Sequence, residues 1–384
     1  MYKFINIKSI IAFFILISLV FVLGTSSFAE FESLAGSAIL MEATTGQILY
    51  DKNADNAVPP ASITKLMTLL LGFEAIEKGQ AAWDELVPVS EKAWKAEGSR
   101  MFLEVGTKVK YQDLITGISV VSANDGCIAL AEFLNGSENA FVEVMNQRAK
   151  ELGLTKTQFK NANGLPAEGH IMSARDIAIL ARYIIQKYPQ ILEIESKKDF
   201  TYNNIHQYNR NPLLGVFPGA DGLKTGWTEA AGYCLVGTAK QNGMRVISVV
   251  LNTKDEKERL STSSELLSYG FRNFELTDIK KAGDISGSIS VKNGKNSKVS
   301  LKVDDTITIV VPSNRKDDLK ITSTNNTDLL TAPVTAGTPV GTLSVQLDDQ
   351  ILATSGISTA ENVAKSGFLE VLFSRIKDFF SSLF

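Results

Sequence analysis

The sequence predicts an α/β protein of the α+β type, in which an antiparallel sheet is flanked by helices. A small all-β, sandwich-like domain and a C-terminal amphipathic helix are predicted to follow. Strand patterns at 37–50 and 232–251 enclose a long stretch with helical periodicity. Beyond residue 279 polar and apolar residues alternate, and over 368–384 the apolar side chains share one side of a helix. A chain of 384 residues also exceeds one typical domain of about 100 to 200 residues.

The N-terminal residues, 1–29, have the composition of a secretory signal peptide. Two lysines precede an apolar run over 10–23, and the small residues Ser27 and Ala29 stand where such a signal is cut. An uncleaved anchor helix is the alternative, but it usually needs about 20 apolar residues. We therefore expect cleavage after Ala29 and export from the cell.

Composition excludes some classes of partner. The chain is 44% hydrophobic and 21% charged, as globular proteins are, and its net charge of -3 comes without a basic tract. We therefore expect no nucleic-acid partner. Cys127 and Cys234 lie in apolar stretches without metal or redox spacing, so buried free thiols are favoured, and a disulfide between them stays open. No residue pattern requires a metal or a cofactor.

The first elements are a hairpin and a helix. Two strand-like runs over 37–50 are joined by turn residues. Two prolines then precede Ser62, and from there apolar residues recur at helical spacing as far as Phe73. Ser62 is therefore predicted to begin a buried helix.

Three further helices are predicted in the middle of the chain. One follows Asp113, and one ends before Gly153. The third begins with a capping box formed by Ser173 and Asp176.

Strand patterns return at 232–239 and 244–251, with an Asn-Gly turn between them. Because strands lie on both sides of the helical middle, we expect the first and last strands to meet in one sheet with helices on its faces.

The β-rich part and the tail complete the predicted domain organisation. The predicted strands of the β-rich part are 285–291, 299–303, 306–311 and 340–347. The terminal helix is interrupted by polar residues at every turn, so we expect it to lie in a membrane interface rather than span it. Docking on the protein's own surface is the alternative. The predicted boundaries are 1–29 for the signal peptide, 30–278 for the first domain, 279–364 for the β-rich domain and 365–384 for the anchor helix.

Three short motifs carry the chemistry. They are Ser62-x-x-Lys65, Ser122-x-Asn124 and Lys224-Thr225-Gly226, in that order along the chain. The first pattern alone is weak, since it recurs at 313–316 and 374–377 without supporting context. Taken singly, each motif has a structural explanation as a helix cap, a helix boundary or a turn. Their joint occurrence in this order favours a catalytic site.

The first motif suits nucleophilic catalysis. Lys65 lies one helical turn from Ser62, so its amine can reach the serine hydroxyl. A lysine acts as a base only when it is neutral, and burial with a nearby cation, for which Lys224 is a candidate, would lower its pKa. The only histidines, His170 and His206, stand in no triad or zinc pattern and are expected to be solvated or hydrogen-bonded polar residues.

Together the motifs resemble the signature of penicillin-recognising serine enzymes. The closer resemblance is to low-molecular-mass penicillin-binding proteins, the serine-type D-alanyl-D-alanine carboxypeptidases. It rests on PPASITKLMT at 59–68, VSANDG at 121–126, NANGLP at 161–166 and DGLKTG at 221–226. The resemblance covers about 35–274 and extends to the tail, since this family also has a β-rich domain and an amphipathic C-terminal anchor.

The resemblance implies a penicillin-binding and serine β-lactamase-like transpeptidase fold and a covalent cycle on peptidoglycan stem peptides. Ser62 would attack the carbonyl between the two terminal D-alanines, the last D-alanine would leave, and water would hydrolyse the acyl-enzyme. β-Lactam antibiotics would be covalent inhibitors. The enzyme would work at the outer face of the bacterial cytoplasmic membrane, held to the membrane surface by its C-terminal helix.

The resemblance also implies residue roles. Lys65 would be the general base, and Ser122 would relay a proton to the leaving amine. Asn124 would hold Lys65 and the peptide amide. Lys224 would stabilise charge and help polarise Ser122, while Thr225 would bind the terminal carboxylate.

Further positions match the edge of the site. The backbone amides of Ser62 and Trp227, which follows Gly226, would form the oxyanion hole. This family often has histidine at the place of Trp227, so the indole would keep the hole but alter the rim. Arg210 and Arg259 match arginines near the active-site edge, where a guanidinium suits a carboxylate, although plain surface charge explains them nearly as well.

Two other functions are compatible with the motifs. A serine β-lactamase needs a second base, typically a glutamate in an E-x-x-L-N loop, and Glu168 lies in the right interval but without the Leu-Asn. That function also leaves the β-rich domain and the terminal helix without a purpose. A catalytically silent peptidoglycan-binding protein is the second alternative, and the presence of every chemical residue speaks against it.

Overall fold

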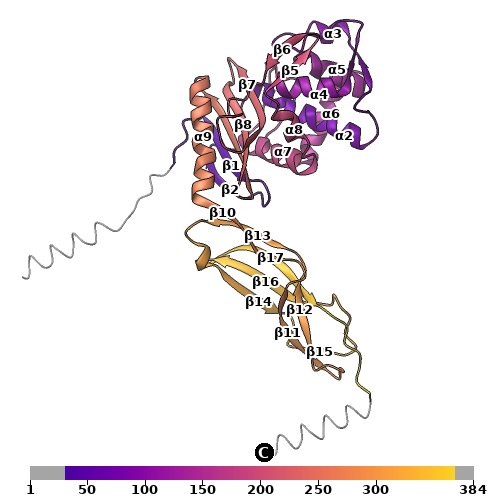
Figure 1. Ribbon diagram of the computed structural model, residues 1–384, viewed down its shortest axis with the longest axis vertical. Helices are drawn as coiled ribbons and strands as arrows, with labels where there is room; N and C mark the ends of the chain where they lie inside the picture. The colour runs from indigo at the N-terminus through magenta and orange to yellow at the C-terminus, as the bar shows by residue number, and fades with distance from the viewer. Residues whose placement is uncertain (1–30, 368–384) are drawn as a thin grey trace, which may run out of the picture. The chain divides into compact units, whose positions relative to one another are not determined.

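The computed structural model describes residues 31–367, which form a mixed helical and β part followed by a β-rich part (Figure 1). The predicted signal peptide and the predicted helix over 368–384 lie outside the described residues. Between residues 31 and 367, no helix has both the length and the apolar character needed to cross a membrane.

The first part is built on a five-stranded antiparallel sheet in the order β2-β1-β9-β8-β7. Its strands are β1 (Ser37–Glu42), β2 (Ile48–Lys52), β7 (Ala220–Thr228), β8 (Gly232–Gln241) and β9 (Met244–Thr253). Ser37 of β1 pairs with Leu251 of β9, so the first and last strands meet as predicted. Strand β7, which carries the Lys-Thr-Gly motif, was not predicted, because its run of small and polar residues lacks apolar alternation.

Helices cover both faces of this sheet. Helix α9 packs on β8 and β9, and α7 packs on β1 and β9 with the remaining helices beyond it (Figure 1). The helices are the short 3-10 turn η1 (Ala61–Thr64), α2 (Lys65–Glu77), α3 (Glu91–Trp94), α4 (Tyr111–Val120), α5 (Asn124–Asn135), α6 (Glu138–Glu151), α7 (Ala174–Lys187), α8 (Ile191–Glu195) and α9 (Glu256–Asn273). Two small hairpins join them, made by β3 (Leu86–Pro88) with β4 (Lys108–Lys110) and by β5 (Asp199–Tyr202) with β6 (Ile205–Tyr208).

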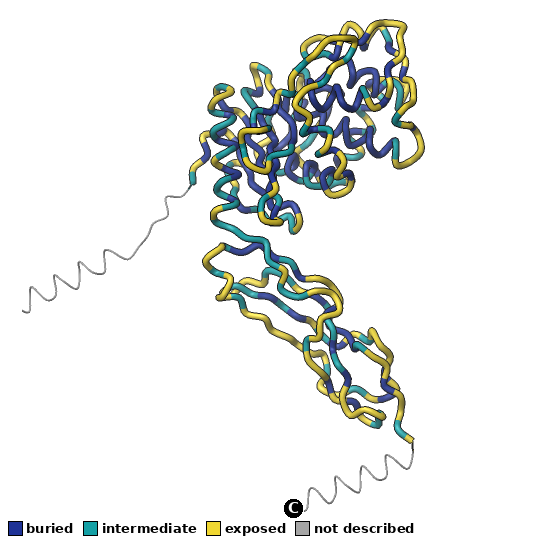
Figure 2. The backbone as a smooth tube through the Cα atoms, in the orientation of Figure 1, coloured by how far each residue is buried: buried dark blue, intermediate teal, exposed yellow. Residues whose placement is uncertain are grey.

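Helix α2 is the centre of the helical core. Every residue of this helix from Lys65 to Ala75 is buried, and Figure 2 shows much dark blue backbone in the helical part. A helix that is apolar on all sides is stable only inside a protein, which is why α2 lies among α4, α5, α6 and α7. The first residue of this rigid helix is the predicted base.

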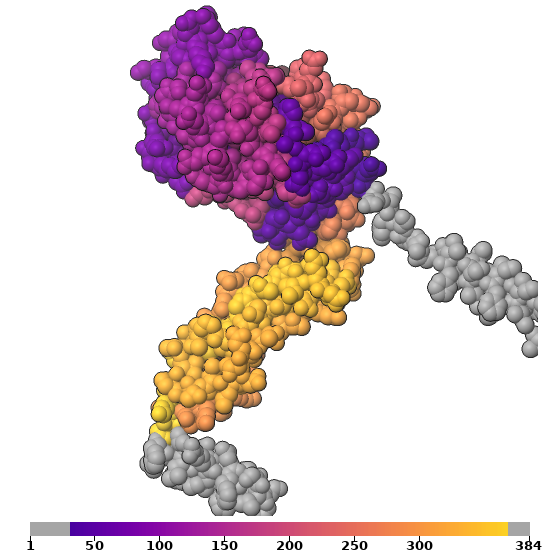
Figure 3. All heavy atoms as spheres, turned by 180° about the vertical axis from the view of Figure 1, so that it is seen from behind, coloured from indigo at the N-terminus to yellow at the C-terminus, as the bar shows by residue number. Residues whose placement is uncertain are grey.

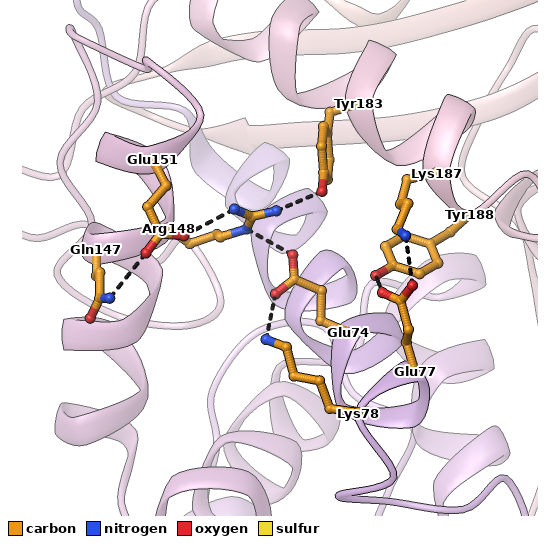
Figure 4. Close-up of polar contacts among 9 residues, drawn as sticks. All are labelled: Glu74, Glu77, Lys78, Gln147, Arg148, Glu151, Tyr183, Lys187 and Tyr188. Carbon is orange, nitrogen blue, oxygen red and sulfur yellow. Dashed lines mark hydrogen bonds and ion pairs between the residues drawn. The ribbon is translucent and has the colours of Figure 1, made fainter.

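The far end of α2 is fixed by a network of charges (Figure 4). The buried carboxylate of Glu74 accepts from Arg148 Nε at 2.7 Å and from Lys78 Nζ at 3.1 Å. Arg148 also donates to the Tyr183 hydroxyl at 2.6 Å, so the network joins α2, α6 and α7. A buried carboxylate with several donors resists movement, and α2 is therefore held at both ends.

One predicted helix start forms only in part. Ser173 caps α7 by accepting from the Asp176 amide at 3.1 Å, as expected. The Asp176 carboxylate does not complete the box. It accepts instead from the Lys156 amide and the Thr157 hydroxyl, both at 2.7 Å. These tertiary contacts replace the hydrogen bond to the Ser173 amide that a capping box would contain.

The β-rich part has its own core and two sheets. A six-stranded sheet runs in the order β14-β16-β17-β12-β11-β15, and β10 pairs with β13. The strands are β10 (Phe274–Lys280), β11 (Ile285–Lys292), β12 (Lys298–Val303), β13 (Ile307–Pro312), β14 (Lys320–Asn325), β15 (Leu329–Thr331), β16 (Pro339–Leu347) and β17 (Gln350–Thr359), with a 3-10 turn, η2 (Lys316–Asp318), after β13. The yellow atoms of the last described residues gather with neighbouring orange atoms in one body (Figure 3).

The four predicted strands of this part are present as β11, β12, β13 and β16. Strand β10 runs across the predicted boundary between 278 and 279. Strands β14, β15 and β17 were not predicted. All six residues of β14 are exposed, so no buried face gave it an alternating pattern.

Candidate active site

Ser62 lies at the floor of a cavity, in the 3-10 turn η1 rather than in the first turn of α2 as predicted. Its Oγ accepts a hydrogen bond from Lys65 Nζ at 2.8 Å. The backbone of Ala61 is left-handed, with φ of 48°, which turns the chain into this short 3-10 segment. The nucleophile and its predicted base are therefore in direct contact.

Lys65 is fully buried, and burial lowers its pKa from 10.5 to about 8. Its Nζ also donates to the Asn163 carbonyl at 2.5 Å. Arg210 lowers the pKa of Lys65 further, and the charges of Lys65 and Lys224 oppose each other. Since its amine loses a proton near neutral pH, Lys65 can accept the proton of the Ser62 hydroxyl.

The second motif lies between α4 and α5. Ser122 has a left-handed φ of 61°, an uncommon conformation for a residue with a side chain. Its buried Oγ and the Oδ1 of Asn124 have no hydrogen-bond partner within the described residues. The Asn124 amide donates to the Glu97 carbonyl at 2.6 Å, and the predicted contact with Lys65 is not among the hydrogen bonds of residues 31–367. Both groups are thus available to a bound substrate.

Lys224 brings a second buried amine to the site from strand β7. Its Nζ donates to the Thr225 carbonyl at 3.2 Å, and the predicted contact with Ser122 is not formed. Burial and, after it, the charge of Lys65 hold the pKa of Lys224 below its usual value. Two ammonium groups in one buried site repel each other, which favours a state with only one of them charged.

Glycine is required where β7 meets the nucleophile's turn. A Cβ on Gly226 would lie 3.0 Å from the Pro60 carbonyl oxygen and 3.2 Å from the Ser62 backbone nitrogen. The strand therefore runs directly against the turn. This contact brings the segment after Gly226 beside the Ser62 amide, the arrangement expected for an oxyanion hole.

The cavity has a volume of about 960 Å³ and gathers the three motifs into one site. The predicted residues that line it are Ser62, Ser122, Asn124, Arg210, Thr225, Gly226, Trp227 and Arg259. Lys65 and Lys224 lie beneath its surface, 0% and 2% exposed. All the residues predicted for the site are therefore brought together, and the two lysines are buried beneath the residues that line the cavity.

The rim combines aromatic and cationic groups. Trp227 is 57% exposed, and its ring centre lies 5.9 Å from that of Tyr233. Arg259 Cζ lies 5.6 Å from the centre of the Tyr233 ring on the same wall. Arg259 is buried, and its Nε has no partner within residues 31–367, whereas Arg210 is exposed. Two guanidinium groups thus face a cavity able to admit a carboxylate.

His170 supports the nucleophile's turn from behind. Its Nδ1 accepts from the Lys160 amide at 3.3 Å, so its Nε2 carries the proton and donates to Thr64 Oγ1 at 2.8 Å. Thr64 Oγ1 donates in turn to the Ala61 carbonyl at 2.9 Å. Burial lowers the pKa of His170 to about 4, so the ring stays neutral. It is the hydrogen-bonded polar residue that was predicted.

Three contributors to the site were missed from the sequence. Asn163 accepts from Lys65 through its backbone, and Gly164 packs against Ala61, where an added Cβ would lie 1.9 Å from the carbonyl oxygen. The NANGLP motif marked this loop but gave it no role. Glu195 is completely buried at the end of α8, and its sequence context looks like an exposed helix.

Cys127 and Cys234 are free and buried, as favoured from the sequence. In the part of the chain from 31 to 367, His, Cys, Asp and Glu side chains form no group of three or more that could hold a metal ion.

Two family profiles match the chain. The profile of D-alanyl-D-alanine carboxypeptidases matches residues 25–255. The profile of the C-terminal domain of penicillin-binding protein 5 matches residues 274–365. The second match begins at the first residue of β10, five residues before the predicted boundary of 279.

The chain is also similar to characterised proteins over nearly its whole length. It is 37% identical to the D-alanyl-D-alanine carboxypeptidase DacF of Bacillus subtilis over 354 residues, 90% of each protein. Penicillin-binding protein 5 of Haemophilus influenzae superposes with a TM-score of 0.78 at 36% identity, over 87% of this chain and 98% of that one. Penicillin-binding protein D2 of Listeria monocytogenes, solved with ampicillin bound, superposes with a TM-score of 0.58 at 34% identity, over 63% of this chain and 98% of that one.

Proposed function

The chain belongs to the D-alanyl-D-alanine carboxypeptidase family, and we propose that its Ser62 cavity removes the terminal D-alanine from peptidoglycan pentapeptides. The protein is a serine-type hydrolase of the penicillin-binding class. The observation that supports this site assignment most is the 2.8 Å hydrogen bond between Ser62 Oγ and the buried amine of Lys65. An amine with a pKa of about 8 is a competent base for a serine hydroxyl.

The first half of the reaction is acylation. Ser62 Oγ attacks the carbonyl carbon between the two D-alanines, and its proton passes to Lys65 Nζ. The oxyanion forms beside the Ser62 amide and the segment after Gly226, where backbone donors stabilise it. The C–N bond then breaks, and the leaving amine takes a proton through the unpartnered hydroxyl of Ser122. The product is an ester on Ser62.

Deacylation reverses the proton movements. Water attacks the ester carbonyl and gives a proton to Lys65, and the C–O bond to Ser62 breaks as the serine oxygen regains its proton. The free Oδ1 of Asn124 accepts from the substrate's peptide amide. Earlier, before the C–N bond breaks, Thr225 donates to the carboxylate of the terminal D-alanine, and Arg259 supplies charge from the cavity wall.

Penicillins enter the same cycle as false substrates. The β-lactam carbonyl occupies the place of the D-Ala-D-Ala carbonyl and leaves a covalent adduct on Ser62. The related protein of Listeria monocytogenes holds ampicillin, which supports this assignment. The candidate second base of the β-lactamase alternative, Glu168, is exposed and does not line the Ser62 cavity.

The proposal is tested by the release of D-alanine. The wild-type protein is incubated with a pentapeptide that ends in D-Ala-D-Ala, and the free amino acid is measured beside Ser62→Ala. Release by the wild type and none by the variant is expected. No release by the wild type would contradict the function, and release by the variant would move the nucleophile to another residue.

Beyond the active site, we propose that the chain is exported through its residues 1–29 and held at the outer face of the cytoplasmic membrane by its last residues. A relative that is similar over 90% of its length supports a shared organisation. For the limits of the two folded domains we propose 30–273 and 274–365, in line with strand β10 and the second profile.

A further inference from the structure

A buried carboxylate lies behind the catalytic cavity without a role in the reaction as described. Glu195 is 0% exposed, and neither of its carboxylate oxygens has a hydrogen-bond partner among residues 31–367. Glutamate is almost never buried completely unless it is paired, because removing its charge from water costs several kcal/mol. Because burying this carboxylate lowers the stability of the fold, Glu195 is a candidate for a role in the reaction.

The fold holds Glu195 against the strand that carries Lys224. Helix α8 packs on β7, and a Cβ placed on Gly222 would lie 3.7 Å from that of Glu195. Helix α4 packs on the other side of α8 and contributes Ser119, whose hydroxyl lowers the pKa of Glu195. Glu195 is therefore buried where α4, α8 and β7 come together.

The charges around Lys224 are otherwise unfavourable. Lys65 from α2 and Arg210 both oppose a charge on Lys224, while the thiol of Cys127 on α5 is neutral because burial raises its pKa to about 12. Glu195 is the carboxylate that favours the charged form of Lys224. In turn, burial raises the pKa of Glu195, while Lys224 and, after it, Ser119 oppose that rise. The protonation of each of the two groups therefore depends on that of the other.

We propose that Glu195 is a positioning residue that shares a proton with Lys224 and so keeps the Lys224 ammonium available to the reaction at Ser62. The oxyanion and the substrate carboxylate need a cation beside them, and Lys65 must be neutral at that moment. With Glu195 as counter-charge, the one positive charge of the two amines can reside on Lys224. Without it, the charge moves to Lys65 and disables the base.

The same helix end also positions Arg210. Asn209 Nδ2 donates to the backbone carbonyl of Glu195 at 2.9 Å and to that of Lys197 at 2.8 Å. Because these contacts use only the backbone of Glu195, exchanging its carboxylate for an amide leaves the Arg210 loop in place. Glu195→Gln therefore tests the charge with little change in shape.

The first experiment measures the rate of acylation by benzylpenicillin against pH in the full chain. For Glu195→Gln, the acylation rate at pH 7.5 is expected to fall about tenfold, and the part of the pH profile that reflects ionisation of Lys224 is expected to move to lower pH. Glu195→Asp is expected to recover part of the rate. Glu193→Gln, an exposed carboxylate on the same helix, is the matched control and keeps the wild-type profile. A Glu195→Gln profile that superposes on the wild type overturns the proposal.

The second experiment observes Lys224 itself and does not depend on turnover. In protein labelled with 15N at the lysine amines, the Lys224 signal is expected to titrate at lower pH in Glu195→Gln than in the wild type. An unchanged titration overturns the proposal even if the rate falls, as does a fall in melting temperature that accounts for the lost rate.

The proposal rests on the assignment of Ser62 and Lys65. A wild type that neither releases D-alanine nor binds penicillin would end that assignment, whereas an unchanged Lys224 titration would end only the role of Glu195.

Discussion

The amine of Lys65 is fully buried, and its hydrogen-bond partners within residues 31–367 are Ser62 Oγ and the Asn163 carbonyl, both of them acceptors. A charged amine in this place would lose its hydration, which costs free energy, so the neutral form of Lys65 is favoured. The resulting pKa of about 8 leaves a useful fraction of free base at neutral pH. A side chain that stayed charged at this position could not accept the proton of Ser62.

Lys65→Arg tests this requirement. Arginine keeps a positive charge but cannot give up its proton, so acylation by benzylpenicillin is expected to fall by about 10³-fold, in the range typical of a lost general base. In the wild type the acylation rate should fall as pH is lowered below about 8, approaching ~10-fold for each unit, because the amine becomes protonated. Stopped-flow acylation from pH 6 to 9 checks both. A flat wild-type profile would contradict the assignment of Lys65 as base.

His170 makes stability depend on pH. In the folded protein burial lowers its pKa to about 4, whereas in the unfolded chain the pKa is about 6.5. Below pH 6.5 the unfolded state therefore binds a proton that the folded state does not, and stability is lost as pH falls toward 4. Between pH 7 and 4.5 this amounts to about 2 kcal/mol.

His170→Gln should remove that part of the loss. The variant is expected to be less stable than the wild type at pH 7, because the ring packs on Phe159 and bonds Thr64. Its free energy of unfolding should nevertheless fall about 2 kcal/mol less than that of the wild type between pH 7 and 4.5. Urea unfolding at the two pH values measures the difference. Equal losses in the two proteins would show that the ring is protonated in the folded state.

At the scale of elements, the site depends on close backbone contacts between segments that are distant in sequence. The 3-10 turn with Ser62 is packed between strand β7 at Gly226 and the loop at Gly164. An added Cβ would overlap the turn at Gly164 and crowd it at Gly226. The turn thus has little freedom to move, which preorganises the nucleophile and the amide beside it.

Gly164→Ala tests the contact on the loop side. The residue has φ of +86°, and a Cβ would lie 1.9 Å from the Ala61 carbonyl oxygen. We expect the variant to lose more than about 2 kcal/mol of stability and most of its acylation rate, since the turn must shift. Gly153→Ala is the matched control, with φ of +73° and no atom within 4 Å of the new Cβ, so it carries only the backbone strain of about 1 kcal/mol. Similar effects of the two variants on acylation would contradict the packing argument.

Elements also show where local sequence patterns mislead. The Asn-Gly turn between β8 and β9 and the glycine stop of α6 form as predicted, because a positive φ is decided by the residue itself. Strand β7 and the role of Asp176 were not predicted correctly. Each is decided by partners far away in the sequence, β8 in one case and the 156–157 amide and hydroxyl in the other.

At the scale of the whole molecule, the chain joins a catalytic part to a β-rich part with a separate hydrophobic core. The relative from Listeria monocytogenes covers only 63% of this chain although 98% of its own length is matched. The match to that solved chain therefore spans only part of this protein. Because the β-rich part stands in the sequence between the catalytic part and the tail, we expect it to act as a spacer.

Deletion of residues 368–384 should separate attachment from activity. The truncated protein is expected to appear in the soluble fraction after cell lysis, because the predicted amphipathic helix is the proposed membrane contact. Its release of D-alanine from a soluble pentapeptide should be unchanged. Fractionation followed by penicillin labelling measures both. Retention on membranes would show that the signal peptide is uncleaved or that attachment lies elsewhere.

The sequence by itself determined the contact between Ser62 and Lys65, the order of the three motifs, the pairing of the first and last strands and the β-rich character of the second part. Apart from that pairing these features are local, because a lysine one turn from a serine, or alternation along a strand, depends on neighbouring residues. Only the tertiary structure decided that Arg210 also acts on Lys65, that Ser62 lies in a 3-10 turn, and that Glu195 is buried against the strand of Lys224. Those properties depend on distances between segments and on exclusion of water, which no short stretch of sequence contains.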